Sequence, residues 1–208
     1  MSESRRTRLD RETVVLTAEA IVDRDGYDAL TMTVLAGELD TRVSSLYNHV
    51  ANLDDLRSEI QSRAMAQLGR QVSRAAMGRT GGDGLRVLSH ELRAFARAYP
   101  QRYAALTRTP LDRDGFFAAA GEVIEAVGVM VRSTGLADED VLTTGMAIFA
   151  ALHGFVSLEA SGYFTGSFVA DSHLDVVFAQ VVEGAVTAAL SGLGRPHDVG
   201  VLTPTTGA

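Results

Sequence analysis

Residues 31–49 read TMTVLAGELDTRVSSLYNH, and their spacing predicts two short helices joined by a tight turn. Leu35, Ala36 and Leu39 stand at i, i+1 and i+4, which places them on one face of the first helix. The hydroxyl of Thr31 can cap that helix by accepting from its free backbone N–H groups. Asp40 marks the turn, because aspartate tolerates a left-handed backbone, though less well than glycine.

The second helix of this stretch is expected over residues 43–49, with Val43 and Leu46 facing inward. Its polar side chains then face partly outward and can hydrogen-bond base edges or phosphates; they are Ser44, Ser45, Tyr47, Asn48 and His49. A helix of this width fits the major groove of DNA. The spacing is also compatible with an ordinary helical protein, in which Tyr47 is a half-buried aromatic residue and His49 a surface histidine.

A longer pattern surrounds this stretch, and its most specific part is SLYNHV at 45–50 followed by Asn52. The positions that carry it are Ala20, Gly26, Leu30, Thr31, Met32, Leu35, Ala36, Leu39, Leu46, Tyr47, His49, Val50, Asn52, Asp55 and Leu56. By this pattern, residues 9–56 resemble the DNA-binding domain of the tetracycline-repressor (TetR) family of transcription regulators.

The resemblance implies that the second helix is a recognition helix. Carried over by position, Thr31 and Thr33 contact the DNA backbone. The residues implied to face the groove are Arg42, Ser44, Ser45, Tyr47 and His49. Two positions depart from the family pattern: Asp40 stands where glycine is usual, and Leu53 stands where a phosphate-binding lysine is frequent. The second departure weakens one backbone contact and leaves the fold unaffected.

Composition indicates a soluble, cytoplasmic protein with no membrane partner. The chain has 208 residues, of which 46% are hydrophobic, and no cysteine. Its longest unbroken apolar run, residues 146–152, is far shorter than the roughly 20 residues that span a bilayer. The net charge is −7, so DNA binding has to rest on local arrangement, including the arginines of an N-terminal arm. Those arginines are Arg5, Arg6, Arg8 and Arg11, which lie on phosphates in one interpretation and in a solvated tail in the other.

The hydrophobic periodicity predicts an all-α fold of about nine helices without a sheet. We expect an N-terminal three-helix helix-turn-helix domain over 1–50, a C-terminal helical effector-binding and dimerisation domain over 51–195, and a disordered tail over 196–208. One helix, capped by Asn52, is expected to run from the first domain into the second. The glycine-rich run 78–84 is expected to be a connector, and residues 115–134 a single helix. Asp138 is expected to cap the next helix, and Ser172 with Asp175 to form a capping box for the last.

The last two long helices carry many small residues, at Gly145, Ala147, Ala150, Ala151, Gly154, Gly184, Ala185, Ala188 and Ala189. Small side chains let helix axes approach closely, and too many positions are apolar for helices packed on one side only. A two-fold dimer with a four-helix bundle at its centre is the simplest solution. The alternative is that both are central core helices of a monomer.

Two further stretches resemble one branch of TetR C-terminal domains: YPQRY at 99–103 and LHGF at 152–155 with Leu158 and Glu159. The resemblance implies that this domain dimerises and encloses a small-molecule pocket. Apolar walls with a few polar groups are what such a pocket needs, and the candidates are Phe95, Tyr99, Tyr103, Phe116, Phe117, Met146, Phe149, His90, Arg93 and His153. Each aromatic residue can equally be an ordinary side chain of the hydrophobic core, and His153 can equally be a hydrogen-bonded packing residue. The many aromatic side chains among these candidates indicate a hydrophobic or aromatic effector.

Enzyme chemistry is not expected. The sequence has no His-Glu-x-x-His, no Gly-x-Ser-x-Gly, no glycine-rich nucleotide loop and no cysteine nucleophile. The five histidines are scattered, so neither a metal site nor a cofactor is predicted. The sequence therefore favours a dimeric, ligand-responsive repressor that binds a palindromic operator. The rival hypothesis is a helical dimerisation or adaptor protein without specific DNA binding, which leaves the polar face of residues 44–49 without a purpose.

Overall fold

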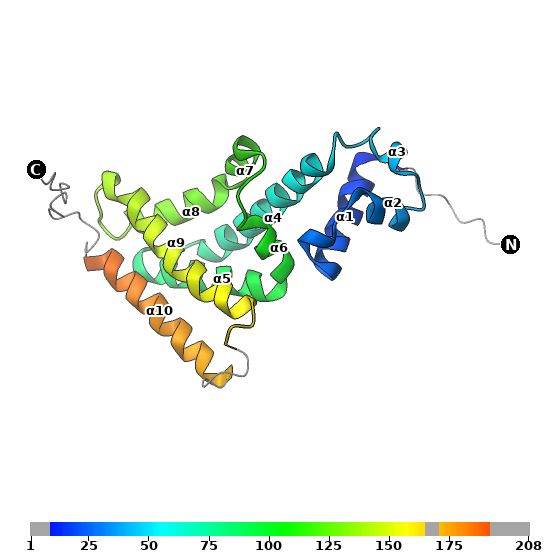
Figure 1. Cartoon of the computed structure of the whole chain (residues 1–208). Coiled ribbons are helices and arrows are strands. Elements are labelled where there is room, and N and C mark those ends of the chain that lie inside the picture. Colours follow the sequence, from blue (N-terminus) through cyan, green and yellow to red (C-terminus); the bar gives the residue numbers. More distant parts are fainter. Residues whose placement is uncertain (1–8, 165–170, 192–208) are drawn as a thin grey trace, which may run out of the picture.

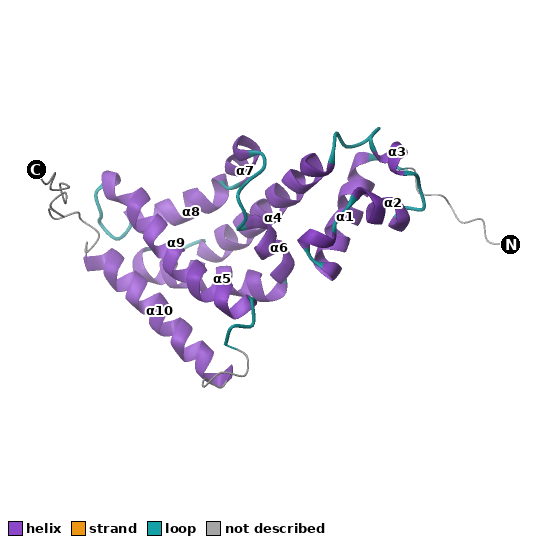
Figure 2. Cartoon of the chain, viewed as in Figure 1, coloured by secondary structure: helices purple, strands orange, loops and turns teal. Residues whose placement is uncertain are grey.

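The computed structural model describes residues 9–164 and 171–191 (Figure 1), and these residues are helical without any strand (Figure 2), which confirms the all-α prediction. The N-terminal elements are α1 (Arg11–Asp25), the 3-10 turn η1 (Tyr27–Ala29), α2 (Met32–Glu38) and α3 (Val43–Leu46). The following elements are α4 (Leu53–Ala76), α5 (Gly81–Ala98), α6 (Pro100–Leu106), α7 (Arg113–Ala119), α8 (Gly121–Arg132), α9 (Asp138–Ala160) and α10 (Asp171–Ser191). Arg5, Arg6, Arg8 and the predicted tail lie outside the described residues.

The N-terminal helices close around one apolar core. Asp10 caps α1 by accepting from the backbone N–H of Thr13 at 2.8 Å. The buried side chains of this core come from α1, η1, α2, α3, the beginning of α4, α6 and the connections after η1 and α3. They are Val14, Val15, Ala18, Ile21, Val22, Tyr27, Leu30, Leu35, Ala36, Leu46, Val50, Leu56, Ile60 and Ala105. The α6 contribution means that this end of the molecule is packed directly onto the C-terminal helices.

Helix α4 is shared between two apolar cores. Asn52 caps it by accepting from the backbone N–H of Asp55 at 2.8 Å, as predicted. Leu56 and Ile60 pack in the N-terminal core, whereas Ala64 and later residues of the same stripe pack among the C-terminal helices. The cores therefore meet inside α4, which runs through both ends of the molecule as one rod (Figure 1).

The prediction of a single helix over residues 115–134 is wrong, because two helices, α7 and α8, occupy this region. Helix α7 begins at Arg113, where Asp112 caps it by accepting from the backbone N–H of Gly115 at 3.1 Å. Ala120 interrupts the helical path with ψ of −8°. A one-residue interruption inside an apolar stretch leaves the hydrophobic period almost unchanged, so periodicity does not detect it.

The glycine-rich run 78–84 is a connector only in its first half, because α5 already begins at Gly81. The backbone N–H of Gly81 donates to the hydroxyl of Ser133 at 2.7 Å. A Cβ placed on Gly84 would overlap the sulfur of Met130 on α8. The glycine therefore permits close helix packing here, which the sequence pattern does not distinguish from a turn.

Both predicted caps of the last two helices are wrong. Helix α9 starts at Asp138 itself, and Ala137 holds the cap position without a side-chain hydrogen bond. Helix α10 starts at Asp171, one residue before Ser172. The carboxylate of Asp175 instead accepts from Arg93 and Arg97 of α5, so tertiary ion pairing replaces the local capping box.

Helices α9 and α10 lie side by side along one edge of the molecule (Figure 1) and leave much apolar surface uncovered. By length and composition, α9 and residues 173–191 of α10 are apolar enough to cross a bilayer, yet only 22% and 28% of their most apolar windows are buried. The exposed large apolar side chains are Leu142, Met146, Phe149 and Leu158 on α9 and Val176 and Leu190 on α10. A Cβ on Gly154 or on Gly184 meets no atom within 4 Å, so both glycines face open space in a single chain.

Candidate functional site

The region predicted to read DNA forms a helix, a tight turn and a second, very short helix. Thr31 caps α2 by accepting from the backbone N–H of Val34 at 3.1 Å. Asp40 has φ of 45° in the turn, the left-handed conformation expected there. Helix α3 ends at Leu46 rather than at 49, and residues 47–49 continue as turns. The helix is shorter than predicted, because the period of the pattern does not show where backbone hydrogen bonding stops.

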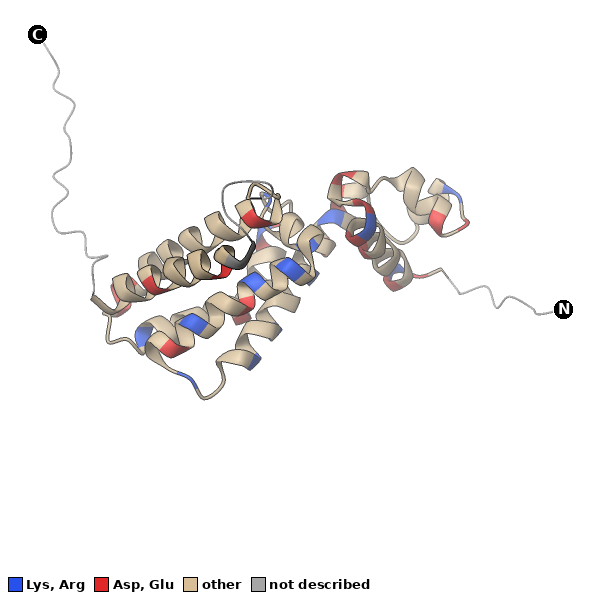
Figure 3. Cartoon of the chain, turned by 90° about the horizontal axis from the view of Figure 1, so that it is seen from below, with Lys and Arg blue, Asp and Glu red and all other residues tan. Residues whose placement is uncertain are grey.

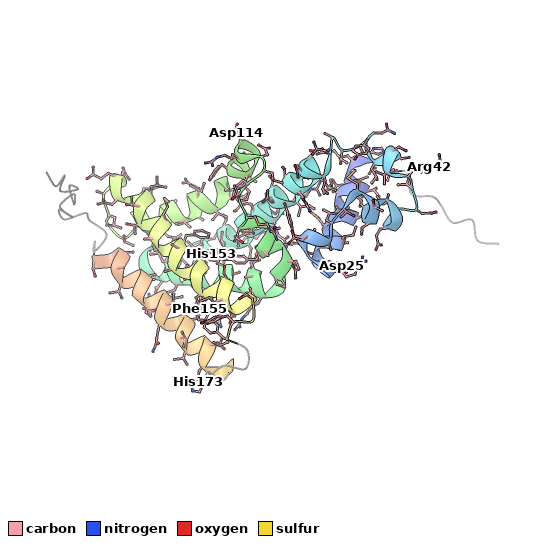
Figure 4. The ribbon with its side chains drawn as sticks, viewed as in Figure 1. Asp25, Arg42, Asp114, His153, Phe155 and His173 are labelled. Atoms are coloured by element: carbon pink, nitrogen blue, oxygen red, sulfur yellow. The ribbon has the colours of Figure 1, made fainter. Side chains whose placement is uncertain are left out.

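Several side chains predicted to face DNA are exposed at the end of the molecule. Thr31, Thr33, Arg42, Ser44, Tyr47 and Asn48 are exposed, while Ser45 and His49 are half-buried. The ring of Tyr47 is 54% exposed, so it is not the half-buried aromatic residue of the alternative interpretation. Figure 4 shows Arg42 at this end of the molecule, far from His153.

Arg42 differs from the other arginines around it. Arg11 pairs with Asp55, Arg24 pairs with Asp25 and Glu38, and Arg57 donates to the carbonyl of Leu30. Within the described residues, Arg42 has neither a carboxylate nor a carbonyl partner. Figure 3 shows both basic and acidic residues on the N-terminal helices, and the unpaired guanidinium of Arg42 stands at the N-cap position directly before α3.

The assignment of Arg11 to the N-terminal arm is wrong. Arg11 is the first residue of α1, and its guanidinium donates to both carboxylate oxygens of Asp55 at 3.0 and 3.1 Å. It also donates to the carbonyl oxygen of His49 at 3.0 Å. These partners lie 38 and 44 residues away along the chain, so local patterns carry no signal for them.

Polar contacts join the N-terminal helices to α6 and the segment that follows it. The buried side chain of Gln61 on α4 donates to the carbonyl of Ala105 at 3.1 Å and accepts from the backbone N–H of Leu111 at 3.3 Å. Arg102 on α6 forms a two-pronged ion pair with Asp23 on α1, with a shortest distance of 2.6 Å. Sequence analysis predicted none of these contacts, because each spans between 44 and 79 positions.

Three of the predicted effector-pocket residues meet between α6 and α9. The hydroxyl of Tyr103 lies 2.8 Å from Nδ1 of His153, and the ring of Phe149 stacks on His153 with centroids 5.4 Å apart. Tyr103 is buried, while Phe149 is half exposed on the outer face of α9. Burial lowers the pKa of His153 and raises that of Tyr103.

The other predicted pocket residues do not join this cluster in any ring contact of the described chain. Phe95 is fully buried and contacts the ring of Tyr99 at 5.3 Å. Phe117 lies on α7 against Phe116, and Met146 is exposed on α9. A hollow of about 520 Å³ lies elsewhere, between the end of α4 and α8, with Met77, Arg79, Glu122, Glu125 and Val129 among its lining residues. None of the predicted pocket residues lines this hollow.

Arg93 is a structural residue rather than a free pocket group. It is 5% exposed, and its guanidinium pairs with Glu159 of α9 at 2.6 Å and with Asp175 of α10 at 2.8 Å. Burial alone would raise the pKa of Glu159, but hydrogen bonds from Arg93 and Arg97 outweigh it and lower that pKa. The guanidinium also lies over the ring of Phe178 at 4.5 Å. His90, another candidate, meets the same ring edge-on.

Comparison with known proteins agrees with this architecture. The family model described as the tetracyclin repressor-like C-terminal domain matches residues 85–190. A protein of Mycobacterium tuberculosis, called the uncharacterized HTH-type transcriptional regulator Rv0681, is 36% identical over 183 residues, which cover 87% of this chain and 82% of that protein.

Two solved structures show the same fold. The Streptomyces coelicolor TetR family protein ActR in complex with (S)-DNPA superposes with a TM-score of 0.66 at 24% identity, covering 89% of this chain and 99% of that one. BioQ with its double-stranded DNA operator superposes with a TM-score of 0.59 at 22% identity, covering 86% and 99%. Because both the family model and the mycobacterial relative match across so much of the sequence, this chain belongs to the TetR family of DNA-binding transcriptional regulators, which are not enzymes.

Proposed function

We propose that the protein is a homodimeric repressor that occupies a palindromic operator and leaves it when a small hydrophobic or aromatic effector binds the C-terminal helices. The observation that carries the proposal is the exposed polar face around α3. Arg42, Ser44 and Tyr47 project there without a role in the core, together with Thr31, Thr33, Ser45, Asn48 and His49 as the proposed DNA contacts. Guanidinium, hydroxyl and amide groups are the donors that read base edges and phosphates.

The dimer is supported by the uncovered apolar face of α9 and α10. In solution this face would expose six large apolar side chains and the open sides of Gly154 and Gly184. Burying it against the same face of a second copy removes it from water, and the glycines allow the helix axes to approach closely. A two-fold dimer would present two recognition helices to half-sites spaced roughly 34–36 Å or a multiple of that.

Coupling between effector and DNA is supported by the position of α6. One of its residues, Tyr103, contacts His153 of α9, while its neighbours Arg102 and Ala105 contact the N-terminal helices. A ligand that displaces α6 or α9 would therefore shift the N-terminal helices and alter the operator spacing. A difference of a few kcal/mol between the two arrangements is enough to release DNA. This proposal is consistent with ActR, which was solved with the small molecule (S)-DNPA, and with BioQ, which was solved with its DNA operator.

The test is a binding titration against the DNA upstream of the coding sequence, at several salt concentrations, with a scrambled duplex as the reference. The expected result is sequence-dependent binding that weakens steeply with salt. Arg42→Ala and Tyr47→Ala should each weaken operator binding while leaving the dimer and the melting temperature unchanged. A parent protein without any preference for the upstream DNA would favour the adaptor hypothesis, and variants that bind like the parent would contradict the assigned recognition face.

A search for the effector follows from the same assay. Candidate aromatic and hydrophobic molecules are added to the protein–operator complex, and release of DNA is recorded together with the melting temperature of the free protein. An effector should release the operator and raise the melting temperature, because it binds the folded state. Release without any change in melting temperature would indicate competition for DNA instead.

A further inference from the structure

The segment that follows α3 is held in place by side chains from two other helices. Its last turn has backbone bonds from His49 and Val50 to the carbonyl of Leu46, at 2.8 and 3.0 Å. Beyond that turn, the backbone N–H of Ala51 donates to the carboxylate of Asp55 at 2.8 Å. Arg11 of α1 donates to the carbonyl of His49 and to both oxygens of the same carboxylate.

A helix of this length needs such support from outside. Helix α3 has four residues, which is too few for a helix to be stable alone, and its last carbonyls find no partner within it. Leu46 is buried in the N-terminal core, and Val43 packs against the same core. Both contacts lie on the inner side of the helix, so the direction of its outer face also depends on how the chain leaves it.

We propose that Arg11 and Asp55 form a positioning pair that sets the orientation of the recognition helix for specific DNA, through the His49 carbonyl and the Ala51 N–H. In this role Arg11 acts through the residues behind α3 rather than by contacting a phosphate. The inference rests on the proposed function of α3 as the recognition helix. The two-pronged geometry of the pair agrees with it, and the hydrogen bond from Arg11 lowers the pKa of Asp55.

The two possible roles of Arg11 predict opposite effects of a substitution at Asp55 on the affinity for the operator. If Arg11 contacted a phosphate and Asp55 only competed for its guanidinium, Asp55→Asn would leave Glu59, at 3.7 Å, as the one remaining carboxylate partner of Arg11 in the described chain and would remove a negative charge near DNA. Operator binding would then tighten. If the pair positions α3, Asp55→Asn loosens the segment and operator binding weakens despite the more favourable charge.

The experiment measures operator and scrambled-duplex binding for the full-length parent, Asp55→Asn, Arg11→Lys and the double variant. Lysine keeps the charge of Arg11 but not the planar fork that reaches two acceptors at once. Asp54→Asn is the matched control, because it removes the same charge one residue earlier from an exposed side chain. Asp55→Asn and Arg11→Lys should each weaken operator binding at least tenfold, with little change in binding to the scrambled duplex. The double variant should lose no more than either single one.

Hydrogen exchange of residues 47–51 gives a second readout that needs no DNA. Faster exchange in Asp55→Asn and Arg11→Lys supports the positioning pair, provided that their melting temperatures are unchanged. The control Asp54→Asn should exchange at the rate of the parent. Unchanged exchange, tighter operator binding by Asp55→Asn, or equal losses on both duplexes would each overturn it. A parent that does not distinguish the operator from the scrambled duplex overturns the proposed function itself, whatever the exchange rates show about the segment.

Discussion

The hydroxyl of Tyr103 on α6 lies 2.8 Å from Nδ1 of His153 on α9. This contact links the helix that packs on the N-terminal core to α9, which carries the exposed apolar side chains of Leu142, Met146, Phe149 and Leu158. Ser157, one turn further along α9, lies 3.2 Å from the same nitrogen, so His153 has two hydroxyl partners inside the protein. Four predictions follow from this relationship and from its surroundings.

Removing the hydroxyl of Tyr103 should cost stability. Tyr103→Phe loses one hydrogen bond at a buried site, so we expect the free energy of unfolding to fall by about 1 kcal/mol. Urea unfolding monitored by circular dichroism measures this change. Tyr163→Phe, at a highly exposed tyrosine, is the control and should leave the midpoint unchanged. An unaltered midpoint in Tyr103→Phe would show that the contact carries no net stability.

His153 should make the protein less stable in mild acid. Burial lowers its pKa in the folded state below the ordinary value of about 6.5, so the unfolded chain binds this proton more readily. Stability is therefore lost as the pH falls from about 6.5 towards the folded-state pKa, where the slope ends. Unfolding free energies at pH 7 and pH 5 should differ less in His153→Gln than in the parent. An equal difference in both proteins would assign the acid sensitivity to other groups.

The buried ion pair between Arg93 and Glu159 should be costly to break from one side. Arg93→Met leaves the carboxylate of Glu159 with Arg97 alone in a largely buried site, so we expect a loss of about 3 kcal/mol. Arg132→Met removes an exposed pair with Glu125 at 3.5 Å and should change stability by less than about 0.5 kcal/mol. Chemical denaturation compares the two variants. Similar small losses in both would mean that Arg97 alone compensates for the loss of Arg93.

A bulky side chain on the outer face of α10 should disrupt the dimer. A Cβ on Gly184 meets no atom within 4 Å in a single chain, so in a monomer Gly184→Leu should stabilise the helix by up to about 1 kcal/mol. In the proposed four-helix bundle the same side chain would collide with the second copy, and sedimentation velocity should show a shift from dimer to monomer. Gly121→Leu is the control on α8, where a Cβ also meets nothing within 4 Å, and it should leave the mass unchanged. A stable dimer in Gly184→Leu would move the interface away from this face.

Local chemistry accounts for the parts of the structure that were predicted correctly. The caps at Thr31 and Asn52, the left-handed Asp40 and the buried stripe of α4 depend on residues within a few positions of each other. Their hydrogen bonds and periodicity are visible in the sequence. The incorrect predictions, at Asp138, Ser172 and Ala120, concern helix ends and interruptions, where tertiary packing decides which backbone groups are paired.

The sequence by itself determined the all-helical fold, which follows from hydrophobic spacing over one or two helical turns, and the family resemblance, which follows from the residue pattern over 9–56. It also indicated the exposed side chains around α3, although Ser45 and His49 are half-buried. Only the tertiary structure decided which distant side chains meet. In the structure Arg11 pairs with Asp55 instead of lying in an N-terminal arm, Arg93 pairs with Glu159, and Tyr103 contacts His153. These pairs lie between 44 and 66 positions apart. The contacts depend on how whole helices pack, and no local period encodes that arrangement.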